Sequence, residues 1–113
     1  VFPGDLQVAG WRALLGNSLF VENLRKVNLF VASHHGRENG YCPEVFDYCS
    51  PQAVIISDGP IQYMSQLTTD IYGRHAAGIQ DGGRQRRVYT TRSDGTILIK
   101  QTPDSGATIS AGN

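Results

Sequence analysis

Two short, continuous apolar runs constrain the fold of this chain more than any other feature. Residues 29–32 and 53–56 read Leu-Phe-Val-Ala and Ala-Val-Ile-Ile, and each run passes directly into a polar loop. Continuous apolar runs of this length are typical of strands buried on both faces. Between them, a short helix is predicted to begin at Pro43 and to end before Pro51. This order of elements predicts a parallel crossover unit and an α/β fold.

Two amphipathic helices are predicted before the first run. In residues 8–15 the apolar side chains recur at helical spacing, and Gly16 follows as a stop signal. A second helix is predicted up to residue 27, with Asn17 or Ser18 as its N-cap.

The last third of the chain carries strand and turn signals. Thr68 or Thr69 is predicted to cap a helix through Ala77, and residues 78–83 are predicted to be an irregular, mobile loop. Next, a β-hairpin is predicted to join residues 88–91 and 96–99. Its turn would lie at the Asp-Gly pair in residues 94–95. The tail, residues 102–113, is small and polar and is predicted to be flexible.

The composition excludes several classes of protein. With 113 residues the chain is one small domain, and its 10 Lys and Arg balance 10 Asp and Glu. No global charge therefore favours nucleic acid or an anionic membrane. No apolar run approaches the roughly 20 residues of a membrane span, and no signal-peptide pattern is present. We expect a cytoplasmic protein in which Cys42 and Cys49, whose spacing matches no common zinc or redox motif, are reduced thiols.

Polar clusters follow three strand-like segments and are the candidates for chemistry. The clusters are Gly4-Asp5, Ser33-His34-His35-Gly36 and Ser57-Asp58-Gly59. Loops at the carboxyl ends of parallel strands are where ligands usually bind. If the first two strands are neighbours, a carboxylate and an imidazole converge at one sheet edge. That geometry suits a metal ion or acid–base chemistry.

Each candidate also has a structural interpretation. Asp5 taken alone is more simply an N-cap of the following helix, and Asp58 is more simply a turn residue. His75 is predicted to be a surface or packing histidine. The His34-His35 pair favours a function instead, because adjacent imidazoles after a buried strand are uncommon as filler.

A set of short motifs in this order resembles the metallo-β-lactamase superfamily, and most closely its competence-protein-type hydrolases. The match covers roughly residues 1–100 and comprises Phe2-Pro3-Gly4-Asp5-Leu6, Ser33-His34-His35-Gly36, the strand at 53–57, the strand at 88–91 and Asp94-Gly95-Thr96-Ile97.

The resemblance implies that residues 1–101 are the C-terminal half of an αββα sandwich with a dinuclear metal site, usually zinc, with manganese as an alternative. On matching positions, Asp5 would bridge both metal ions and one of His34 or His35 would ligate the second. His34 is preferred because the family's ligand usually comes straight off the strand end, and His35 would then contact substrate or support the ligand. Two cations flanking one water lower its pKa, so that hydroxide can attack a phosphoryl or acyl centre near neutral pH.

The chain departs from that pattern in two places. The family's H-x-H-x-D-H cluster, which supplies the other ligands, would lie before Val1, and we expect an N-terminal half of the domain to contribute it. The competence-type branch often has Ser where this chain has Arg37, and Tyr-Gly-His-Pro where it has Tyr-Gly-Arg-His at residues 72–75. These differences argue against carrying the nuclease activity of that branch over.

The leading hypothesis is part of a metal-dependent hydrolase acting on phosphodiester or similar ester bonds of a small molecule or a nucleic acid. The alternative is a non-catalytic binding module that works through the basic cluster Arg84, Arg86, Arg87 and Arg92, although that cluster is more simply a solvated loop and strand end. A third arrangement is a homo-oligomer, or a pair of fragments, that completes the sandwich.

Overall fold

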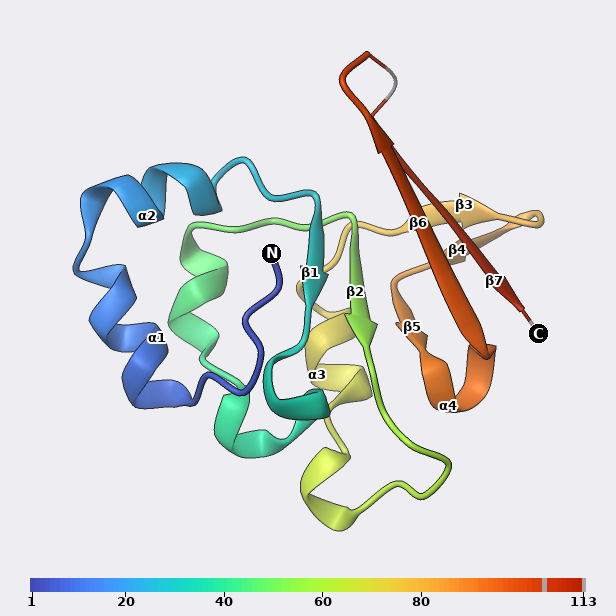
Figure 1. The fold of residues 1–113 in the computed structure, drawn as a ribbon, viewed down its shortest axis with the longest axis horizontal. Coiled ribbons are helices and arrows are strands. Elements are labelled where there is room, and N and C mark those ends of the chain that lie inside the picture. The colour runs from blue at the N-terminus through green and yellow to red at the C-terminus, as the bar shows by residue number, and fades with distance from the viewer. Residues whose placement is uncertain (105, 113) are drawn as a thin grey trace.

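A three-stranded parallel sheet lies at the centre of the chain (Figure 1). The computed structural model describes residues 1–104 and 106–112. In sheet order the strands are β1 (Leu29–Val31), β2 (Ala53–Ile56) and β5 (Val88–Thr90). Strand β2 pairs in parallel with both neighbours, which confirms the predicted crossover unit between β1 and β2.

Helices and 3-10 turns fill the connections between these strands. The longer helices are α1 (Val8–Leu15) and α2 (Ser18–Leu24), and the side chain of Asn17 caps α2 by accepting a hydrogen bond from the Phe20 amide at 3.1 Å. Both were predicted from the apolar spacing, although α2 ends before residue 27. The remaining helical elements are η1 (Ser33–Gly36), η2 (Glu38–Gly40), η3 (Pro43–Asp47), η4 (Met64–Gln66), α3 (Thr69–Gly73) and α4 (Thr91–Asp94).

The two faces of the sheet are covered by different layers. Side chains of adjacent strand residues point to opposite faces. Phe30, Val54 and Ile56 therefore join the helical elements in one core, around Trp11. Their neighbours Ala53 and Ile55 join Tyr89 on the other face. The result is a mixed α/β domain with a helical layer on one side of the sheet only.

A C-terminal antiparallel hairpin covers the second face (Figure 1). Its strands are β6 (Thr96–Thr102) and β7 (Gly106–Gly112), paired from Thr96 with Gly112 to Thr102 with Gly106. Ile97, Ile99 and Ile109 pack from the hairpin onto the sheet.

The hairpin is not the one that the sequence predicted. Residues 88–91 and 96–99 do not pair with each other, because β5 joins the parallel sheet. The Asp94 carboxylate accepts a hydrogen bond from the Thr90 amide at 2.9 Å. Residues Thr91–Asp94 therefore form the helical turn α4 instead of a hairpin turn. The predicted tail contains strand β7, and its residues 105 and 113 lie outside the described residues.

The predicted irregular loop at residues 78–83 was also wrong. Strands β3 (Ile79–Asp81) and β4 (Arg84–Arg86) form a small antiparallel hairpin. Gly82 and Gly83 connect them with φ of 59° and 84°. Two consecutive residues at positive φ are what a tight hairpin turn requires, and glycine adopts them without strain.

Strand β1 is less buried than its apolar run predicted. Phe30 is 2% exposed, but Leu29 and Val31 are only partly buried. Strand β2 is buried along its whole length, as predicted. The hairpin thus covers the β2 side of the second face and leaves the β1 side partly open. Among the described residues, no helix is long and apolar enough to cross a membrane.

Candidate functional site

The loop that follows β1 has an unusual backbone. His34 and His35 lie in η1 with φ of 52° and 57°, the left-handed region that non-glycine residues rarely adopt. Such a conformation costs roughly 1–2 kcal/mol per residue and persists only where the surroundings fix it. Strain of this kind is concentrated at binding and catalytic sites. This strain makes the histidine loop, Ser33–Gly36, the candidate functional site.

Hydrogen bonds fasten this loop to the segment that carries Asp5. The buried hydroxyl of Ser33 contacts the carbonyl oxygen of Gly4 at 3.2 Å and also that of Leu6. The His34 amide donates to the Gly4 carbonyl at 2.8 Å. Because these contacts flank Asp5 on both sides, they place its carboxylate beside the histidine loop.

Gly36 closes the loop against β2. Its φ is 78°, and a Cβ at this position would lie 2.8 Å from Cγ2 of Ile56. The buried Thr68 hydroxyl donates to the Gly36 carbonyl at 2.6 Å. A side chain is therefore excluded here both by the positive φ and by the close approach of β2.

Asp5 and His35 face each other at the carboxyl end of β1. The distance from His35 Nε2 to Asp5 Oδ1 is 3.9 Å, and their side chains are 58% and 73% exposed. His35 Nδ1 lies 2.8 Å from the Ser57 carbonyl oxygen. A carbonyl can only accept, so Nδ1 donates a proton to it, and in a neutral ring Nε2 would present a lone pair. Metal-ligating histidines are oriented in the same way.

His34 takes a different position. Its Nδ1 lies 2.7 Å from Oδ1 of Asn39, and its ring centroid is 6.4 Å from that of His35. Among the described residues the ion-pair contact to Asp5 is made by His35 and not by His34. The structure brings Asp5 and His35 together, as the sequence predicted for Asp5 and the histidine pair. The preference for His34 as the metal ligand stays a prediction.

The Asp5–His35 pair fits part of a metal site. Two donors about 2.0–2.2 Å from one tetrahedral zinc lie roughly 3.3–3.6 Å apart, close to the observed 3.9 Å. Within residues 1–104 and 106–112, no three His, Cys, Asp or Glu side chains are grouped closely enough to hold a metal by themselves. Further ligands would therefore have to come from outside this set.

Asp58 and His75 have structural roles, as the sequence predicted for each. The Asp58 carboxylate is 2% exposed and accepts hydrogen bonds from the Arg92 amide at 2.9 Å and from Arg92 Nε at 3.1 Å. It fastens the loop after β2 to α4. His75 stacks on Phe46 with centroids 4.0 Å apart, and its Nε2 lies 2.6 Å from the Tyr41 hydroxyl. Burial, followed by the nearby Arg74 charge, lowers the pKa of His75.

The basic cluster is partly neutralised by carboxylates. Arg86 pairs with Asp94 at 2.9 Å, and Arg92 pairs with Asp58 at 3.1 Å. Arg84 and Arg87 are exposed, and no carboxylate pairs with them among the described residues. The surface therefore offers two free cations where the sequence showed four.

Sequence reasoning missed a pocket that adjoins His35. This pocket of about 320 Å³ is lined by His35, Arg37, Gly59, Pro60, Ile61, Tyr63 and Gln66. One signal was present, because Ser57-Asp58-Gly59 was among the polar clusters at strand ends and Gly59 lines this pocket. Residues 61–66, which form the rest of the loop, carried no motif.

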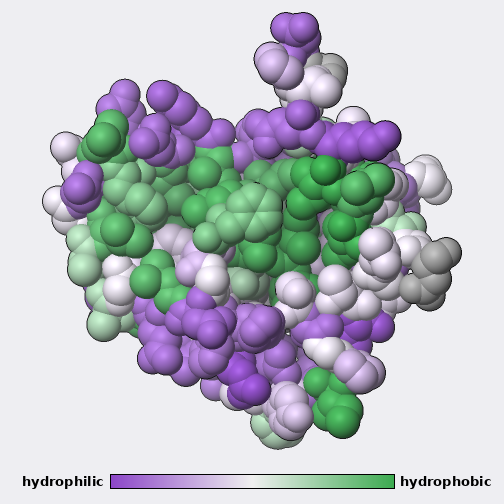
Figure 2. Space-filling model, in the orientation of Figure 1, coloured by the Kyte–Doolittle hydropathy of each residue, from purple (hydrophilic) through white to green (hydrophobic). Residues whose placement is uncertain are grey.

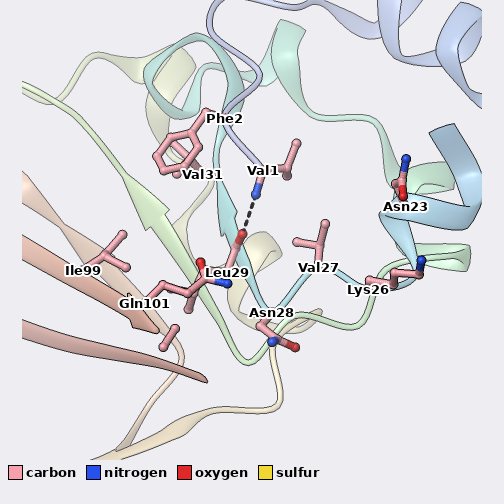
Figure 3. Close-up of a pocket in the computed structure, with 11 residues that line it drawn as sticks. Val1, Phe2, Asn23, Lys26, Val27, Asn28, Leu29, Val31, Ile99 and Gln101 are labelled. Atoms are coloured by element: carbon pink, nitrogen blue, oxygen red, sulfur yellow. Dashed lines mark hydrogen bonds between the residues drawn. The ribbon is translucent and has the colours of Figure 1, made fainter. Parts of the chain in front are cut away.

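A second hollow lies on the open side of the sheet, over β1 (Figure 3). It has a volume of about 280 Å³ and is lined by residues of the first segment, the end of α2, β1 and the hairpin. The Val1 amino group donates to the Leu29 carbonyl at 2.8 Å, and the Val31 amide donates to the Val1 carbonyl at 3.1 Å. This pattern continues the parallel sheet beyond β1.

Comparisons with protein-family models, curated proteins and solved structures found no match to this chain.

Proposed function

We propose that this chain is part of a metal-dependent hydrolase acting on phosphodiester or similar ester bonds. The observation that carries the proposal is the convergence of Asp5 and His35, two exposed side chains held 3.9 Å apart by a strained loop. His35 Nδ1 is bonded to the Ser57 carbonyl, and its exposed Nε2 faces the Asp5 carboxylate. Binding of a cation is the use that this arrangement fits best.

The metal ions would be divalent, with zinc the best match to a carboxylate and an imidazole and manganese as an alternative. Once bound, they supply a water of lowered pKa and a Lewis acid for the developing oxyanion. Asp5 has two oxygens and can offer one to each of two cations. His35 would bind as a neutral ring and would leave the positive charge uncancelled, and His34, which lies next to it, could contact substrate or the second ion.

We propose further that the fold is half of an αββα metallo-β-lactamase-like sandwich whose N-terminal half supplies the missing ligands. The helix, sheet and hairpin layers support this interpretation. So does the apolar character of the partly open face, where apolar side chains gather in a band across the surface (Figure 2). A sheet face of this kind is stable in water only when another layer covers it. A second copy of the chain is the competing partner.

The first test replaces the carboxylate. In the full-length protein, Asp5→Asn should lower hydrolysis of bis(p-nitrophenyl) phosphate by at least about 100-fold, because the cations lose their shared ligand. Inductively coupled plasma analysis should find about two metal ions per wild-type chain and fewer in the variant. Asp47→Asn, at an exposed position in η3, is the matched control and should change neither value. Full activity and full metal content in Asp5→Asn would disprove the proposal.

A second test separates the two histidines. Because His35 faces Asp5, His35→Gln should lower the metal content more than His34→Gln does. Equal retention of metal in both variants would contradict the assignment of His35 as the ligand.

The alternative of a non-catalytic binding module is supported less well. It depends on the basic cluster, and two of its four arginines are held by Asp58 and Asp94. A steep fall of nucleic-acid affinity with salt, in a protein without metal, would favour it.

A further inference from the structure

Arg37 lies next to the histidine loop, and the proposed function does not use it. Its Nη1 donates to the Ser65 hydroxyl at 3.0 Å, and its guanidinium carbon lies 5.3 Å from the centre of the Tyr63 ring. The side chain is partly buried, yet among the described residues no carboxylate forms an ion pair with it. A guanidinium has five N–H donors, and among residues 1–104 and 106–112 Arg37 has the Ser65 hydroxyl as its acceptor, so donors remain for a ligand.

The position of Arg37 is fixed by the loop that connects β2 to α3. Gln66, which is 6% exposed, donates from Nε2 to the His35 carbonyl at 2.9 Å and accepts from the Tyr63 amide at 3.1 Å. This one buried amide joins the histidine loop to the opposite wall of the 320 Å³ pocket. Arg37 and His35 therefore line the same pocket, and their relative position is set by the fold.

The opposite wall is apolar and exposed. Ile61, Tyr63, Met64 and Leu67 are 65%, 55%, 81% and 53% exposed, which makes them half of the eight large apolar residues exposed on the described chain. Ile61 and Tyr63 line the pocket itself. Apolar side chains gathered in one loop beside an unpaired cation favour a ligand with an anionic and an apolar part.

We propose that this pocket binds the substrate, and that the substrate is an organic phosphate ester whose phosphoryl group pairs with Arg37 and whose apolar group packs on Tyr63 and Ile61. This inference rests on the proposed function, because it assigns a substrate to the same site. Arg37 matches a phosphoryl group because its planar fork of donors can bond two oxygens at once. Tyr63 is 55% exposed, so its ring leaves apolar surface on which a flat organic group can pack.

Binding can be tested without catalysis. In EDTA-treated full-length protein, phenyl phosphate and inorganic phosphate are titrated by calorimetry into the wild type, Arg37→Gln, Tyr63→Ala and the control Arg84→Gln. Arg84 is exposed and lies outside the pocket, so its variant removes the same charge elsewhere. Arg37→Gln should weaken phenyl phosphate by about tenfold or more, whereas Arg84→Gln should leave it within about twofold.

Tyr63→Ala should weaken phenyl phosphate by about threefold or more and leave inorganic phosphate within about twofold, since only the ester has a ring to pack. Equal losses for both probes would overturn the role of Tyr63. An Arg37→Gln affinity within twofold of the wild type, or a larger loss in Arg84→Gln, would overturn the proposal.

Spectroscopy of the wild type decides the matter if a variant does not fold. Phenyl phosphate should shift the NMR signals of the Tyr63 ring and of His35, and shifts confined to residues 84–92 would overturn the inference.

Asp5→Asn separates the two proposals, because it should keep phosphate binding while losing hydrolysis. Binding that depends on Arg37 in a protein without hydrolysis would refute the proposed function alone. If the protein hydrolyses the ester but Arg37→Gln binds phenyl phosphate as the wild type does, only the substrate assignment is refuted.

Discussion

The two faces of the central sheet are built from the same strands but differ in how completely they are covered. On the helical face, Trp11, Leu24, Phe30 and Tyr72 are each at most 2% exposed. On the hairpin face, Ala53, Ile55 and Tyr89 are buried, but the surrounding isoleucines of the hairpin remain partly exposed. The core on the helical face is completely buried. On the hairpin face, the residues of β2 are buried, whereas those of β1 are only partly buried.

This difference indicates that the two faces contribute unequally to stability. The helical face should provide most of the stability, because the free energy of burial scales with the apolar area removed from water. The hairpin face contributes less, because its apolar side chains are less completely buried. The histidine loop lies at the carboxyl edge of the sheet, between the two faces. Its strained backbone is held in place by the hydrogen bond from Thr68 to the Gly36 carbonyl and by the close packing of Gly36 on Ile56.

The largest expected change in stability is in the buried core of the helical face. Phe30→Ala should lower the free energy of unfolding by about 3–5 kcal/mol, because it leaves a cavity in a packed aromatic cluster. The Phe30 ring lies 5.7 Å from Trp11, 4.9 Å from Phe46 and 6.2 Å from Tyr72, measured between centroids. Urea unfolding followed by circular dichroism measures the change. A loss below about 1 kcal/mol would mean that the helical face is not the main source of stability.

A smaller effect is expected on the hairpin face. Ile99→Ala should cost about 1–2 kcal/mol, less than a fully buried isoleucine, because this side chain is only partly covered. Leu98→Ala is the matched control in the same strand, since Leu98 is 51% exposed, and it should cost no more than about 0.5 kcal/mol. The same urea experiment applies. Equal losses at the two positions would show that the hairpin does not pack on the sheet in solution.

The smallest effect appears only in acid. Because the pKa of His75 is lowered in the folded state, the unfolded chain takes up a proton first as the pH falls below about 6.5. The contribution of His75 to stability is therefore present above that pH and is lost as the pH falls through the lowered folded pKa. His75→Phe keeps a ring against Phe46 and should show a smaller loss of stability between pH 7 and pH 5. Parallel pH profiles for the two proteins would contradict this.

The N-terminal two thirds of the fold were predictable because their signals are local. The apolar spacing of α1, the Asn17 cap and the apolar runs of β1 and β2 each determine their own element. The C-terminal third was not predictable, since the Asp94-Gly95 pair is equally compatible with a hairpin turn and with a helical turn. The Asp94 carboxylate accepts a hydrogen bond from the Thr90 amide, and β5 pairs with β2, from which more than thirty residues of chain separate it. Only tertiary pairing decides between those outcomes.

The candidate site divides in the same way. The sequence predicted that Asp5 meets the histidine pair on the condition that the first two predicted strands are neighbours, and the strand order itself could not be read from one sequence. Which histidine faces it depends on two positive φ angles, which no spacing encodes. The Arg37 pocket depends on Gln66, a residue whose sequence context gives no reason to expect it beneath the histidine loop.

The Ser33 hydroxyl helps to set the position of Asp5 relative to the histidine loop. It has one proton and stands between two carbonyl oxygens, those of Gly4 and Leu6, on either side of Asp5. The spacing of Asp5 and His35 therefore depends on a buried hydroxyl that belongs to neither side chain. A substitution at Ser33 should change this spacing while both side chains stay intact.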